Sequence, residues 1–137
     1  MVRCIVAVIC GLIAGGVFNM AVIMLSWMIY PLPEGVNLYD QATMRTYVQS
    51  LPVPAFLMIL VAHAGGALVG GLVAALIARR LPLVLGAIVG GFFLVGGILN
   101  VMSIPAPLWF VIVDLVSYVP CGMVGAKLAP LRSARVS

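Results

Sequence analysis

Charged side chains are scarce in this sequence, and their scarcity excludes a water-soluble fold. Only 7% of the 137 residues are Asp, Glu, Lys or Arg, whereas soluble domains contain about 25%. Hydrophobic residues make up 65% of the chain, and the mean hydropathy is +1.31. So few charges cannot cover the surface of a globule in water. We therefore expect the chain to lie in a lipid bilayer.

Residues that commonly carry catalytic chemistry are also few. The chain has one histidine, three acidic residues and three cysteines, Cys4, Cys10 and Cys121, which form no close pair. This spacing predicts neither a disulfide framework nor a zinc site. The sequence contains no nucleophile with a neighbouring base and no glycine-rich phosphate loop. We expect no enzyme activity, no cofactor and no metal.

Four long apolar stretches are present instead. They cover residues 4–30, 54–78, 82–102 and 107–126. At a rise of about 1.5 Å per residue, each stretch is long enough to cross a hydrocarbon layer of about 30 Å. We predict an all-α membrane protein in which residues 1–137 form a single domain, a bundle of four transmembrane helices.

The basic residues predict the orientation of this bundle. Six of the seven lie before the first span, between the second and third, or after the fourth: Arg3, Arg79, Arg80, Lys127, Arg132 and Arg135. Because positive charge accumulates on the cytoplasmic side, we predict that both termini are cytoplasmic and that residues 31–53 form an outer loop. Topology and contact with anionic lipids also account for the net charge of +4, so we expect no nucleic acid as a partner. We expect a multi-pass protein of a bacterial cytoplasmic membrane.

The outer loop carries the signals of one short helix. Asp40 can cap the N-terminus of a helix over residues 41–50. Met44, Tyr47 and Val48 follow one another at helical spacing. We predict a short amphipathic helix that lies on the outer surface.

Small residues recur every four positions in the spans and predict close helix packing. A helix face without bulky side chains lets another backbone approach and gain van der Waals contact. The predicted packing seam consists of Gly11, Gly15, Gly66, Gly70, Gly86, Gly90 and Gly125. Through such seams we expect the chain to form a homo-oligomer or to join a larger membrane complex.

Two pairs of spans resemble one another internally. Residues 11–18 match residues 86–93 at a spacing of 75, and residues 66–74 match residues 121–129. Self-similarity of this kind predicts the duplication of a helical hairpin. Both hairpins begin on the same side, so the repeat would be parallel, with its axis along the membrane normal.

Four polar residues interrupt the apolar spans: Asn19, His63, Asn100 and Asp114. All four fall in the outer half of the predicted bilayer. A carboxylate that faced lipid would cost about 2.5–3.5 kcal/mol, so we expect Asp114 to have a partner or to be protonated. His63 is the other ionisable residue deep in a span. We predict a buried polar site made of these four residues and Tyr118, which follows Asp114 by one helical turn.

Three functions are compatible with such a site. The first is a structural or accessory unit, in which a His63–Asp114 hydrogen bond fixes which helices pair and the glycine seams bind a partner. The second is an oligomeric proton-linked transporter or channel, because an imidazole beside a carboxylate can change its charge near neutral pH. The chain has the same number of spans as the small multidrug transporters, but its first span lacks a glutamate. The third is a lipid- or quinone-binding module. A transporter needs a water-filled route to the pair, whereas an accessory protein needs an exposed seam.

Overall fold

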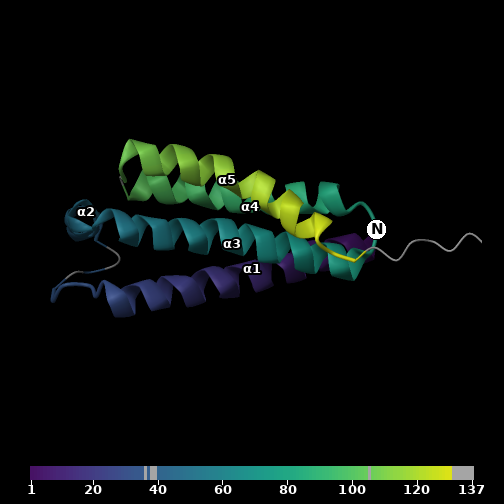
Figure 1. Ribbon diagram of the computed structural model, residues 1–137, viewed down its shortest axis with the longest axis horizontal. Coiled ribbons are helices and arrows are strands. Elements are labelled where there is room, and N and C mark those ends of the chain that lie inside the picture. Colours follow the sequence, from purple (N-terminus) through teal and green to yellow (C-terminus); the bar gives the residue numbers. More distant parts are fainter. Residues whose placement is uncertain (36, 38–39, 105, 131–137) are drawn as a thin grey trace, which may run out of the picture.

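The computed structural model describes residues 1–35, 37, 40–104 and 106–130, and this part of the chain forms five helices and no strand. They are α1 (Val2–Ile29), α2 (Gln41–Ser50), α3 (Val53–Ala78), α4 (Pro82–Ser103) and α5 (Leu108–Lys127) (Figure 1). In the described chain α1, α3, α4 and α5 are long and apolar enough to cross a membrane. The sequence predicted their bounds to within two residues. The chain is a multi-pass membrane protein.

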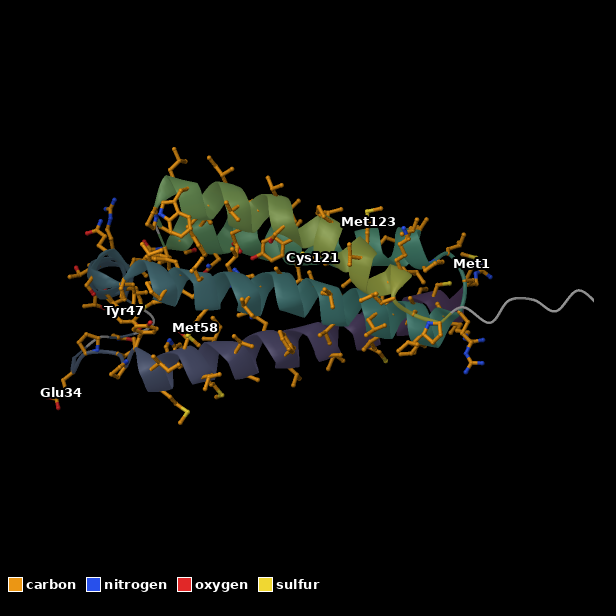
Figure 2. The ribbon with its side chains drawn as sticks, viewed as in Figure 1. Met1, Glu34, Tyr47, Met58, Cys121 and Met123 are labelled. Carbon is orange, nitrogen blue, oxygen red and sulfur yellow. The ribbon has the colours of Figure 1, made fainter. Side chains whose placement is uncertain are left out.

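The four spans lie side by side along the longest axis of the molecule and define two ends (Figure 1). The start of α1, the end of α3 and the end of α5 lie together at one end, which we call the arginine end because it carries Arg3, Arg79 and Arg80. The helix α2 lies at the opposite end, which we call the α2 end. Met1 and Glu34 mark these two ends in Figure 2.

A tight turn joins α3 to α4 at the arginine end. It places two residues without glycine's freedom, Arg79 (φ 55°) and Leu81 (φ 48°), in the left-handed region. The Nε of Arg3 donates a hydrogen bond to the carbonyl of Ile77 at 2.7 Å. This bond ties the start of α1 to the last turn of α3, whose carbonyls lack partners within the helix.

At the α2 end, the predicted capping residue starts α2. The carboxylate of Asp40 accepts hydrogen bonds from the backbone N–H groups of Thr43 (3.2 Å) and Ala42 (3.3 Å). These bonds, that from Thr43 first, lower the pKa of Asp40 below its ordinary value of 3.8, because they favour the charged form.

Two side chains hold α2 against the spans. Tyr47 and Val48 are buried in a cluster with Phe56 and Phe110. The hydroxyl of Tyr47 donates a hydrogen bond to the carbonyl of Tyr30 at 3.0 Å, so the residue lies between α2 and the end of α1 (Figure 2). Burial raises the pKa of the Tyr47 hydroxyl. That α2 lies on a membrane surface stays a prediction.

Glycines bring α1 and α3 into backbone contact near the arginine end. Gly11 lies against the carbonyl of Gly70, and Gly15 against that of Gly66, so that a methyl group at either α1 position would overlap these oxygens. From this crossing α1 diverges from α3 toward the α2 end (Figure 1). The close approach therefore covers only part of the helix length.

The other predicted seam glycines also contact helices of the same chain. Gly86 lies against the backbone of Gly122, Gly90 against that of Tyr118, and Gly125 against the backbone of α3. Gly122 was not among the predicted seam residues, although α4 and α3 both approach it closely. In consequence α3 packs on all three other spans, whereas α1 and α4 touch only slightly.

Candidate functional site

The one histidine and the one acidic residue within the spans lie in direct contact. His63, from α3, places its Nδ1 2.9 Å from Oδ1 of Asp114, from α5. Asp114 is 1% exposed and His63 is 13% exposed. The acid is therefore enclosed behind the imidazole, and the imidazole is the member of the pair that other molecules can reach.

Tyr118 completes the bonding of the acid. Its hydroxyl donates a hydrogen bond to Oδ2 of Asp114 at 3.1 Å, a contact that the spacing of one helical turn allows. Gly97 of α4 makes room for the phenol ring, because a methyl group at this position would touch the ring. Both carboxyl oxygens thus have a partner, as a buried acid in a membrane span requires.

The rings of three residues stack beside the acid. The centroids of His63 and Tyr118 lie 5.8 Å apart with planes at 27°, and those of Phe93 and Tyr118 lie 6.5 Å apart with planes at 13°. Phe93 was not predicted as part of the site, because an aromatic residue in an apolar span gives the same sequence pattern whether it faces lipid or a site. The stack fixes the imidazole in one orientation.

A partly open pocket of about 620 Å³ borders this stack. The helices α1 and α4 form two of its walls, α2 and the start of α3 line it at the α2 end, and His63 and Tyr118 lie along it. Its lining is mainly apolar and includes Trp27, Phe92 and Phe110. We call this cavity the α1–α4 pocket.

Asn19 adds an unsatisfied polar group to the pocket. The residue lines the pocket, and its Oδ1 is buried without a hydrogen-bond partner among the described residues. Its Cβ lies beside Gly66, one helical turn along α3 from His63. A buried polar atom without a partner costs about 1–3 kcal/mol, so its retention requires an explanation.

The predicted polar residues thus meet at one place, although they do not all bond to one another. Asn19, His63, Asn100 and Tyr118 line the α1–α4 pocket, and Asp114 lies behind them. Asn100 is exposed, so the prediction that it is buried is wrong. In the part of the chain that the structure describes, the side chain of Asn100 has no hydrogen bond to the pair. No group of three or more His, Cys, Asp or Glu residues in that part is placed to hold a metal ion.

The protonation chemistry of the pair determines what His63 offers to the pocket. A net-neutral pair consists either of an imidazolium with a carboxylate or of a neutral imidazole with a carboxylic acid. In both cases Nδ1 is engaged with Asp114 and Nε2 carries a proton. Nε2 makes no hydrogen bond within the described residues, so it is free to bond to a ligand in the pocket: it donates where it carries the proton, and it accepts where Nδ1 alone carries the proton.

Comparisons with known proteins add no relative to this picture. No family model, no curated protein and no solved structure matches the chain. The arrangement of the site is therefore the basis for assigning a function.

Proposed function

We propose that this membrane protein binds a lipid-soluble molecule, of the lipid or quinone class, in the α1–α4 pocket. The observation that carries the proposal is a pocket of about 620 Å³, mainly apolar, with His63, Asn19 and Tyr118 along it. This volume lies within the range of about 300–1,000 Å³ that small-molecule sites occupy. An apolar body would lie against the walls, and a polar head would meet His63.

The pocket extends over a length that suits an amphiphile. Asn19 and Trp27 both line it from α1, and they are eight residues apart, or about 12 Å along a helix. His63 and Asn19 lie at one part of the pocket, and the rest of its lining is mainly apolar, with Ser26 and Asn100 as further polar residues. A ligand with a polar head and a mainly apolar body would match this lining.

The membrane and the orientation of the chain form part of the proposal. Arg3, Arg79 and Arg80 at one end favour placing that end in the cytoplasm of a bacterium. The α2 end would then face outward, and the pocket would lie in the outer half of the bilayer. The glycine contacts of the α1–α3 and α4–α5 pairs also favour two parallel hairpin repeats, with the second pair shifted in register.

A structural or accessory role in a complex stays a second prediction. The seam glycines Gly11, Gly15, Gly86 and Gly90 contact other helices of this chain. A partner or second copy would therefore have to bind another face, such as the exposed apolar side chains of α1. Proton-linked transport is a third candidate, and the partial exposure of His63 to the pocket favours it.

Tryptophan fluorescence offers a direct test of ligand binding. The chain has two tryptophans: Trp27 lines the α1–α4 pocket, whereas Trp109 does not line it and packs on Phe56 and Phe110, which do. The variants Trp109→Phe and Trp27→Phe each leave one of them as a reporter. In detergent, we expect a dibrominated fatty acid or a short-chain quinone to quench Trp27 saturably, and to quench it more strongly than Trp109.

Two glycines of α4 supply a matched blocking experiment. Gly96 lines the pocket and Gly91 does not, and neither has an atom within 4 Å of an added Cβ. Gly96→Leu should fill the pocket and abolish the saturable quenching of Trp27, whereas Gly91→Leu should preserve it. Equal, linear quenching of both tryptophans by both probes would overturn the proposal.

A further inference from the structure

The residues around the pocket select one ligand class from the broader proposal. We infer that the α1–α4 pocket takes a quinone, a planar ring with carbonyl oxygens and an apolar tail, and that the ring lies beside His63. This inference rests on the proposed ligand-binding function. It depends on two independent observations, the distribution of aromatic side chains and the hydrogen-bonding groups that have no partner.

Aromatic side chains are concentrated at the pocket. Seven of the ten Phe, Trp and Tyr residues that the structure describes line it. Three rings in the stack of His63, Tyr118 and Phe93 already lie in offset face-to-face order beside it. A planar ring can extend such a stack, since aromatic faces attract one another in this arrangement. A saturated acyl chain gains nothing specific from it.

The free polar groups call for an acceptor on the ligand. Nε2 of His63 has no hydrogen-bond partner among the described residues, and where it carries the proton it needs an acceptor on the ligand. The Oδ1 of Asn19 is enclosed, which leaves the amide N–H₂ as the end of that side chain able to reach the pocket. Carbonyl oxygens of a quinone accept hydrogen bonds from both groups.

The buried acid strengthens one of these bonds. Asp114 holds Nδ1 at 2.9 Å and is itself held by the Tyr118 hydroxyl. Where Nδ1 accepts the carboxyl proton of Asp114, polarisation along this chain makes the N–H at the far side of the imidazole a better donor. The feature that favours a quinone over a fatty acid is the aromatic stack beside His63, which a planar ring extends and an acyl chain does not.

A competition experiment tests the ligand class. The Trp109→Phe protein in detergent is titrated with decylubiquinone, and the quenching of Trp27 is measured with and without excess unbrominated stearic acid. We expect saturable quenching that stearic acid does not displace. Quenching by dibromostearic acid should in turn be relieved by decylubiquinone. If stearic acid displaced decylubiquinone, and decylubiquinone did not displace dibromostearic acid, the quinone assignment would be overturned and the pocket would be a lipid site.

The substitution Asn19→Leu tests the hydrogen bonds without removing the shape of the side chain. Because it replaces a polar group that has no partner, we expect the variant to fold at least as well as the native protein. Its affinity for decylubiquinone should fall about tenfold, which corresponds to the loss of one hydrogen bond. Ser103→Ala, a polar deletion on α4 outside the pocket, should leave the affinity unchanged.

A second variant, Gly96→Leu, tests whether the quinone binds in the pocket at all. Gly96→Leu should abolish decylubiquinone binding through steric exclusion, whatever the polar groups do. An unchanged affinity in Asn19→Leu, together with lost binding in Gly96→Leu, would show that the pocket binds the quinone without these hydrogen bonds and would overturn their assignment. Unchanged binding in both variants would place the quinone outside the pocket.

Discussion

The arginine end and the α2 end of this bundle are built on opposite principles. Toward the arginine end, Gly11 and Gly86 press against the backbones of neighbouring helices, and a tight turn and an Arg3 hydrogen bond close the structure. Toward the α2 end, α1 diverges from α3 and a pocket of about 620 Å³ opens. One part of the bundle is thus closely packed through glycines, and the other contains an open pocket.

Glycine serves both purposes, at positions that differ by a single residue. Gly15 lies against the backbone of Gly66, where a side chain would clash, whereas Gly16 lines the pocket and has no atom within 4 Å of an added Cβ. One glycine permits helix contact and the next enlarges the cavity. A glycine-rich pattern in a membrane span therefore has to be resolved position by position before it indicates packing.

Of the substitutions that distinguish the two ends, those at the buried His63–Asp114 pair should change the unfolding free energy most. His63→Ala removes the Nδ1 partner of Asp114 and leaves the enclosed acid with the Tyr118 hydroxyl alone. We expect the free energy of unfolding, measured by steric trapping in bicelles, to fall by about 3–5 kcal/mol. Asp114→Asn keeps hydrogen-bonding groups at both positions and should cost clearly less. Equal losses in the two variants would argue that the two residues are not coupled.

A smaller effect, confined to the packing, is expected for two adjacent glycines of α4. A Cβ at Gly90 would meet the backbone of Tyr118 and Val119, at 2.6 and 2.7 Å, whereas a Cβ at Gly91 would meet no atom within 4 Å. Overpacking of this kind costs about 1–3 kcal/mol. We expect that loss in the unfolding free energy of Gly90→Ala and none in Gly91→Ala. A loss of the same size in both would show that the helix itself, and not the contact, is affected.

A still smaller effect is expected when only the hydroxyl at the site is removed. Tyr118→Phe keeps the ring that stacks on His63 and Phe93 but deletes the bond to Oδ2 of Asp114. The unfolding free energy should fall by about 1 kcal/mol, the net value of a typical hydrogen bond. Tyr47→Phe deletes a hydroxyl bonded to the carbonyl of Tyr30 and should instead raise hydrogen exchange in α2. Similar hydrogen exchange in α2 for Tyr118→Phe and Tyr47→Phe would contradict the prediction that only the Tyr47 hydroxyl holds α2.

The fold followed from the sequence because its determinants are local. Span length and hydropathy depend on consecutive residues, and the Asp40 cap with its helix over Gln41–Ser50 depends on a few positions. The meeting of His63 with Asp114 was suggested by depth and by the cost of an isolated acid. The pocket could not be predicted, since Phe93 and Gly96 give the same apolar signal in a wall, a core or a lipid-facing surface.

The smallest effect in the comparison concerns the cap of α2 and its dependence on pH. The bonds from Thr43 and Ala42 lower the pKa of Asp40 below 3.8, so the carboxylate stabilises α2 fully above that value and loses the contribution as the pH falls through the lowered pKa. We expect the protection of α2 amides from hydrogen exchange to decrease in this acidic range while the spans stay protected. Asn caps helices about as well as Asp but does not titrate, so Asp40→Asn should retain protection at low pH. Loss of protection at the same pH in Asp40→Asn would assign the effect to another group. A decrease that includes the spans would mean that α2 and the bundle unfold together, and the two ends would then be one cooperative unit.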